Sequence, residues 1–295
     1  MAATLSAPPL PAEREPVRRR SSGAPRWGSP GVYAFAALLI TAMLAPVVYI
    51  VVGGFRTNAQ ITSDPAGLPS PWRLDNYVDV LSGGVFWRQV LNSTIAATAT
   101  TLGVVALGLM VSFALARYRF RGQGVMYALF AAGLMFPLTV AITPLYILVR
   151  TLGLMNDLGG VILPQIAFAL PTTVIILVPF LRAIPAELQE AAAIDGCSRL
   201  GFFWRMVLPL SVPGVITVGI LAFIGSWNSY LLPLFVLNDS GAFTLPLGVQ
   251  AFSSEYSVDT AKVLAFTSLA MLPALVFFSL FERRIVGGLT GAVKG

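Results

Sequence analysis

Long apolar stretches alternate with polar segments along this chain. Six of them contain no Asp, Glu, Lys or Arg: Val32–Phe55, Gln89–Ala116, Gly122–Val149, Leu158–Leu181, Met206–Asn238 and Val263–Phe281. Each is long enough for a transmembrane helix, because about 20 mostly apolar residues cross the hydrocarbon core of a bilayer. The fifth is too long for one straight helix, and its three prolines predict a kink or an interfacial turn. The pattern predicts an all-α, polytopic membrane protein with six transmembrane helices.

The composition supports this class and excludes others. Hydrophobic residues make up 56% of the 295 positions and charged residues 11%, and the mean hydropathy is +0.80. Soluble domains carry about 25% charged residues, so this chain has too little charge to cover a water-facing surface. A soluble enzyme, a disordered protein and a nucleic-acid-binding domain are therefore excluded as the main body. Without His and with one Cys, Cys197, the chain offers no His-based catalytic or metal site and no internal disulfide.

The distribution of basic residues predicts the orientation. If the N-terminus is cytoplasmic, 14 of the 19 Lys and Arg residues fall on cytoplasmic segments. The positive-inside rule then places both termini in the cytoplasm, which suits a bacterial cytoplasmic membrane. We expect a disordered basic tail at 1–31, a six-helix transmembrane domain at 32–281 and a cytoplasmic tail at 282–295. A cleaved signal peptide is the alternative for the first stretch, but its apolar run is too long and begins too late.

The cytoplasmic loop at 182–205, between spans 4 and 5, has the features of a docking element. Pro185 can start a helix, the following residues to Ile194 are mostly helix formers, and Gly196 can end it in a left-handed conformation. A second short helix is expected from Ser198. The carboxylates of Glu187, Glu190 and Asp195 could meet Arg or Lys of a partner, and Ala191 and Ala192 permit close approach. The aromatic run Phe202–Trp204 is expected to pack beneath the bundle. The alternative is a solvated loop whose Ala and Glu content reflects helix propensity alone.

The same loop resembles the EAA loop of permease subunits of ABC importers. The matching positions are Glu190-Ala191-Ala192, Gly196 and Met206-x-Leu208-Pro209, with Met206 where the family usually has Ile. Further segments resemble the carbohydrate branch of that family, namely Leu74–Tyr77, Asn92–Thr94, Met135–Pro137, Pro144–Tyr146, Trp227–Asn228 and the C-terminal run 282–295, which is similar to the maltose-type second permease. A short surface helix is also expected around Leu74–Leu81.

The resemblance implies a type I ABC importer permease fold and a set of partners. These are a second permease subunit forming a heterodimer, two ATPase subunits and an extracytoplasmic solute-binding protein. It assigns ATPase coupling to Glu187, Glu190, Ala191, Ala192, Asp195, Gly196, Leu208 and Pro209. In this interpretation Glu190 is a charged anchor, Gly196 fixes the turn, and Asp195 caps the second helix or contacts the ATPase.

The chain itself is not expected to be an enzyme. A phosphate-binding loop needs Gly-Lys-Ser/Thr, but Lys262 and Lys294 follow Ala261 and Val293. ATP and Mg are therefore expected on the partner ATPase subunits. No catalytic residue, metal or cofactor is assigned to this chain.

Uncharged polar residues in the spans are the candidates for lining a substrate pathway: Asn92, Thr139, Thr143, Gln165, Ser226, Trp227, Asn228 and Tyr230. Aromatic faces and neutral hydrogen-bonding groups suit a sugar or oligosaccharide. The same side chains could instead bond to neighbouring helices. The absence of charge in the spans argues against an ion-coupled carrier. A permease for a glycerophosphodiester, an amino acid or a peptide is the alternative function.

Overall fold

The computed structural model describes residues 30–252 and 258–293, with side chains as far as Ser279. The all-α prediction is confirmed, because the described residues form helices joined by turns and loops and no β-strand. The α-helices are α1 Pro30–Gly53, α2 Asn58–Ser63, α3 Asp75–Ser82, α4 Gly84–Arg117, α5 Gln123–Gly133, α6 Leu138–Thr151, α7 Gly159–Arg182, α8 Ala186–Ile194, α9 Arg199–Phe202, α10 Leu208–Leu210, α11 Val212–Trp227, α12 Leu231–Val236 and α13 Thr260–Val293. A π-helix, η1, spans Phe203–Val207, and a 3₁₀ helix, η2, spans Leu245–Phe252.

Four of the described helices are long and apolar enough to cross a membrane on their own: α1, α4, α7 and the part of α13 from Thr260 to Ser279. Two bent pairs bring the number to six if each pair is one span. The pair α5–α6 is bent by 101°, and the segment Arg199–Leu210 is bent by 75° against α11. The stretch expected as the third span, 122–149, is thus two helices joined at a bend. Pro137 interrupts it, since a proline disfavours helical geometry in the residue before it.

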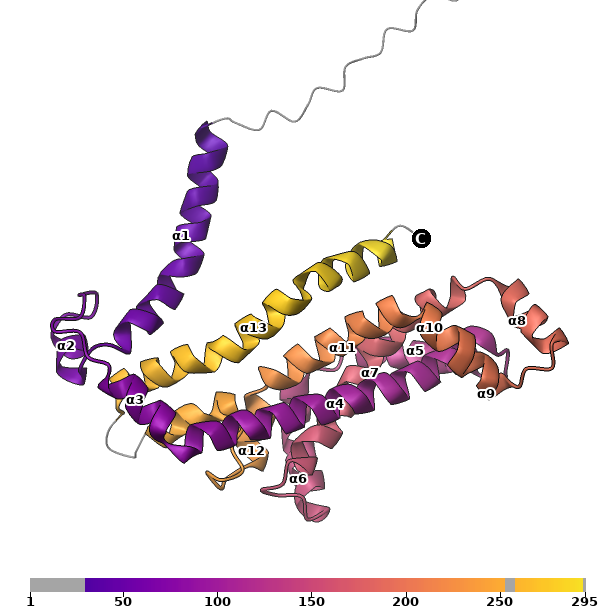
Figure 1. Cartoon of the computed structure of the whole chain (residues 1–295). Helices are drawn as coiled ribbons and strands as arrows, with labels where there is room; N and C mark the ends of the chain where they lie inside the picture. Colours follow the sequence, from indigo (N-terminus) through magenta and orange to yellow (C-terminus); the bar gives the residue numbers. More distant parts are fainter. Residues whose placement is uncertain (1–29, 253–257, 294–295) are drawn as a thin grey trace, which may run out of the picture. The chain divides into compact units, whose positions relative to one another are not determined.

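The chain divides into two compact units, one ending at Pro46 and the other starting at Val47. In the second unit, α4, α7 and α11 pack side by side (Figure 1). One buried cluster, which includes Leu109, Leu181 and Val207, joins these helices to α8 and α9. A second cluster joins α6, α7 and α12 around Val161 and Val236. The boundary expected at 281–282 lies inside α13, whose helix continues to Val293.

A buried arginine organises the segment between α1 and α3. Arg56 is 2% exposed, and its guanidinium donates to the carbonyl oxygens of Pro65 (3.1 Å), Gln60 (2.7 Å) and Asp64. The expected surface helix is confirmed as α3, where Asn76 donates to the carbonyls of Gly54 and Arg56. One cation therefore satisfies three backbone acceptors and holds the loop against α3.

We expect Arg56→Met to loosen this segment. Hydrogen bonds to a charged donor contribute about 1.5–3 kcal/mol each. The change removes three of them: the Pro65 carbonyl loses its donor, whereas the carbonyls of Gln60 and Asp64 keep one backbone N–H each. The loss in free energy of unfolding should be about 2–4 kcal/mol, measured by thermal unfolding, with faster proteolysis between residues 57 and 74. Arg73→Met is the matched control, because Arg73 makes an exposed ion pair with Asp75 (3.0 Å), which is worth less than about 1 kcal/mol. Equal losses for the two variants would contradict the capping role.

Candidate functional site

The loop at 182–205 forms two short helices, as the sequence predicts. α8 starts directly after Pro185, and Gly196 follows it with a φ of +73°, a left-handed conformation that suits glycine. The Ser198 hydroxyl accepts a hydrogen bond from the Gly201 N–H at 3.1 Å and caps α9. The expectation that Asp195 caps the second helix is therefore wrong. Asp195 ends α8, and its backbone N–H donates to Ala191.

The two faces of α8 have opposite character. Ala192 is buried against Phe202, Phe203 and Leu181, so this alanine packs inside the chain. Glu187, Glu190, Ala191 and Asp195 are exposed. Among the residues that the structure describes, none of these carboxylates lies in an ion pair. One face of α8 is therefore packed against the rest of the chain, and the opposite face is exposed and acidic.

The aromatic run after α9 divides between core and surface. Phe202 and Phe203 are buried, as expected, whereas Trp204 is 61% exposed. The expectation that Trp204 packs beneath the bundle is wrong, because a helical turn that buries two consecutive residues directs the next one outward.

Arg117 ties this loop to α4, a contact that sequence analysis did not anticipate. Its Nη2 donates to the carbonyl oxygen of Ile184 at 2.7 Å. A hollow of about 370 Å³ lies beside this contact, lined by Arg117, Gln189 and Glu190 among others. The sequence could have indicated this contact, because Arg117 lies in the last turn of α4 and a cation at a helix end can bond to free carbonyl groups.

The loop continues into α11 through a bend. Leu208 is partly buried against the cluster that holds Ala192, and Pro209 is exposed. Ser211 is buried at the bend, and its hydroxyl donates to the carbonyl of Val207 at 2.6 Å. Movement of α8 and α9 would therefore act on α11 through a short, internally bonded connection.

Three of the core helices share a polar contact. The Gln165 Oε1 of α7 accepts hydrogen bonds from Thr100 Oγ1 of α4 at 3.1 Å and from Ser226 Oγ of α11 at 2.6 Å. Both acceptor sites of this oxygen are thereby used between helices. The structure thus places two of the candidate pathway residues, Gln165 and Ser226, in contact with each other. Thr100 is a third partner that the sequence analysis missed.

The other candidate pathway residues do not gather in one place. The Asn92 amide donates to the carbonyls of Gly241 (3.1 Å) and Phe243 (3.0 Å), so it fixes the segment before η2. Thr139 and Thr143 are exposed on α6. Asn228 and Tyr230 are exposed just after α11.

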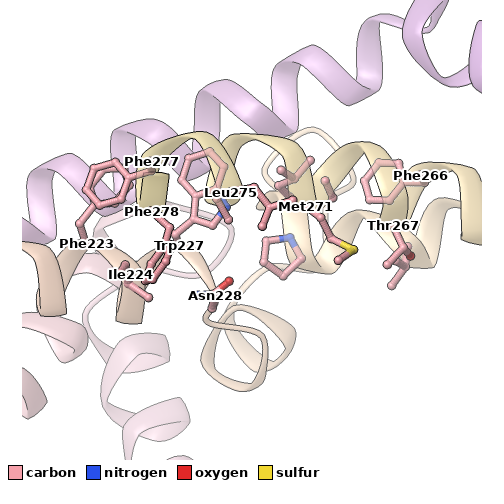
Figure 2. A pocket seen from close by; sticks show the side chains of 15 residues that line it. Phe223, Ile224, Trp227, Asn228, Phe266, Thr267, Met271, Leu275, Phe277 and Phe278 are labelled. Atoms are coloured by element: carbon pink, nitrogen blue, oxygen red, sulfur yellow. The ribbon is translucent and has the colours of Figure 1, made fainter. Parts of the chain in front are cut away.

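A cavity of about 520 Å³ lies between α11, η2 and α13 and includes Trp227 and Asn228 in its lining. Figure 2 shows Phe223, Phe277 and Phe278 at one end and Phe266 and Thr267 at the other. The Phe223 ring stacks on both Trp227 (5.8 Å between centroids) and Phe277 (4.2 Å). Asn228 and Thr267 are the polar side chains of an otherwise mostly apolar lining.

Residues 105–286 match the profile of the family described as binding-protein-dependent transport system inner membrane component. The chain belongs to this family. The matched region includes the loop at 182–205, the bend at Ser211 and α11. This permease is thus a membrane-embedded component of a transport system, and the recognition made from the EAA loop is confirmed.

Individual relatives agree with the family. A diacetylchitobiose uptake system permease protein of Streptomyces coelicolor is 34% identical over 88% of this chain and 86% of its own. A trehalose transport system permease protein of Mycobacterium tuberculosis is 36% identical over 88% of this chain and 95% of its own. In three dimensions, the crystal structure of a bacterial ABC transporter that imports alginate contains a similar chain, with a TM-score of 0.73, 21% identity, and coverage of 86% and 94%. This last similarity confirms the importer permease fold.

Proposed function

We propose that this permease subunit forms half of the translocation pathway for a sugar or oligosaccharide and is driven by two ATPase subunits. The observation that carries the proposal is the geometry of α8, whose inner face is packed on the bundle while its outer carboxylates are unpaired. The named substrates of its relatives, diacetylchitobiose and trehalose, support the carbohydrate assignment.

Coupling would pass from α8 to the membrane helices. An ATPase that contacts Glu190 differently in its open and closed forms would favour one of two bundle arrangements, which is the energetic requirement for alternating access. Ala192 and Arg117 fasten α8 to the bundle, so α8 would move with it as one body. The bend at Ser211 would pass that movement to α11. Gly196 would hold the angle between α8 and α9.

The partners follow from the proposed orientation. With both termini in the cytoplasm, α8 faces the ATPase subunits, which bind ATP and Mg. The opposite end, with α2, α3 and η2, faces an extracytoplasmic solute-binding protein. A second permease subunit completes the pathway, because the candidate polar residues of this chain do not enclose a site by themselves.

Within this chain, the candidates free to meet a sugar are the exposed polar residues near the ends of α6 and α11: Thr139, Thr143, Asn228 and Tyr230. The Asn92 amide nitrogen bonds inside the chain, which favours a structural role for this residue. The Gln165 oxygen also bonds inside the chain, but Gln165 Nε2 is buried without a partner among the described residues. Trp227 is buried and stacked, so it would support Asn228 rather than face the pathway.

The test is uptake by the host with and without this gene. We expect deletion to abolish entry of one labelled sugar or oligosaccharide from a panel that also contains glycerophosphodiesters, amino acids and short peptides. The wild-type gene should restore uptake, and Asn228→Ala should restore it with at least a fivefold lower rate at normal protein abundance. Leu102→Ala, an exposed apolar change on α4, is the control. Loss of amino acid or peptide entry with unchanged sugar entry would overturn the carbohydrate assignment and leave the importer class intact.

A further inference from the structure

Four exposed arginines surround the turn between α4 and α5. This arginine cluster consists of Arg119 and Arg121 in the turn, Arg182 at the end of α7 and Arg199 at the start of α9. The Arg199 guanidinium lies 5.1 Å from the ring centre of Tyr118, and that of Arg182 lies 5.7 Å from the ring centre of Tyr127. Because both tyrosines lie close to the turn in sequence, Arg182 and Arg199 approach the segment that carries Arg119 and Arg121.

Among the described residues, the arginine cluster has no acidic partner within ion-pair distance. Over the residues that the structure describes, the ion pairs are Arg73–Asp75 and Lys262–Asp79, both outside the cluster. The carboxylates at the same end of the bundle are carried by α8 and are themselves unpaired. The described carboxylates of α8 do not neutralise the arginine cluster, so both groups are available to binding partners of opposite charge.

An apolar surface adjoins the arginine cluster. α5 has no buried residue, and Val125 and Leu129 are each 67% exposed. The turn that joins it to α4 is well fixed, because the Gln123 amide donates to the carbonyl of Leu115 at 2.7 Å. A partner that fits both surfaces has an anionic head and an apolar tail.

We propose that the arginine cluster binds the phosphate headgroup of an anionic phospholipid whose acyl chains lie along α5. Guanidinium groups form paired, charge-assisted hydrogen bonds with phosphate, and basic surfaces at the ends of transmembrane helices recognise anionic headgroups. Arg182 and Arg199 also belong to the segment that holds α8, so a bound lipid would fasten the coupling loop to the α4–α5 turn. The acidic face of α8 remains free for the ATPase.

The experiment uses the complete transporter, purified through a tag on this chain. Native mass spectrometry would count bound lipid during titration with phosphatidylglycerol or with phosphatidylcholine. We expect the wild-type complex to prefer phosphatidylglycerol and Arg119→Gln/Arg121→Gln to bind it about 30-fold more weakly, from a factor of about five for each arginine. Arg119→Lys/Arg121→Lys should keep most of the affinity, because the charge is retained.

The matched control is Arg88→Gln/Arg150→Gln, which removes two positive charges from the opposite end of the bundle and should leave phosphatidylglycerol binding unchanged. Equal phosphatidylglycerol affinity for the wild type and Arg119→Gln/Arg121→Gln would overturn the proposal. So would loss of the ATPase subunits from that variant, since it would show that an acidic protein surface occupies the cluster. Sugar uptake by the same variants is measured in a separate assay. A negative result for lipid binding would therefore overturn the lipid proposal without contradicting the proposed transport function.

Discussion

Glu190→Lys is expected to abolish substrate-stimulated ATP hydrolysis by the assembled transporter while this chain remains folded and inserted. Glu190 is exposed on α8 and has no ion pair among the described residues, so the internal packing of the chain should not change. At an interface with a basic partner, charge reversal costs several kcal/mol, which corresponds to at least a tenfold loss. The measurement is ATP hydrolysis by purified complex in proteoliposomes, with and without substrate and its binding protein.

Glu190→Asp is the matched control, because it keeps the negative charge at the same exposed position of α8. It should retain stimulated hydrolysis. A second variant tests the shape of the loop: Gly196→Pro cannot adopt a φ of +73° and loses the N–H that donates to Ala193, whereas Gly196→Asn tolerates this conformation. We expect Gly196→Pro to be inactive and Gly196→Asn to be active. Normal stimulation in both Glu190→Lys and Gly196→Pro would refute docking through α8.

Gly160→Ala is expected to have the largest effect on folding. Gly160 lies in the first turn of α7, and a Cβ there would be 2.3 Å from the carbonyl oxygen of Leu154 and 2.9 Å from methyl groups of both Val149 and Val236. The first of these atoms is backbone and cannot rotate away. Overpacking usually costs about 1–3 kcal/mol and sometimes more, and we expect about 3 kcal/mol or more here. The measurement is the fraction of monodisperse protein that survives a heating series in detergent.

Gly225→Ala on α11 is the control, since a Cβ at Gly225 meets no atom within 4 Å. It should match the wild type or be slightly more stable, because alanine has the higher helix propensity. If Gly160→Ala survived heating as well as Gly225→Ala, the close approach of α7 to the α6–α7 turn would not limit stability.

Much of the coupling loop could be predicted from sequence because its signals are local. Helix formers after Pro185, glycine at 196 and serine at 198 each act within one or two turns of their own position. The structure places α8, the left-handed residue and the start of α9 where those signals predict. The apolar runs likewise predict the spanning helices, because length and hydropathy alone decide whether a segment can cross a bilayer.

The assignment of polar residues to a pathway could not be made from sequence. In the sequence, Gln165 and Asn92 are simply polar residues within a span. In the structure, Gln165 bonds to Ser226, and Asn92 bonds to the carbonyls of Gly241 and Phe243, all of which are distant in sequence. A side-chain amide within a membrane either lines an aqueous path or bonds to another helix. The spacing of polar residues along a single helix does not distinguish these two roles.

By itself, the sequence determined the class of protein, the approximate positions of its spans and the two short helices of the loop at 182–205, because hydropathy, charge distribution and helix signals are properties of short segments. Only the tertiary structure decided which face of α8 is buried, at which residues the third and fifth spans bend, and how Arg182 and Arg199 approach the α4–α5 turn. These features depend on contacts between residues tens of positions apart, such as Arg182 with Tyr127 and Arg199 with Tyr118. Such contacts exist only once the helices have packed.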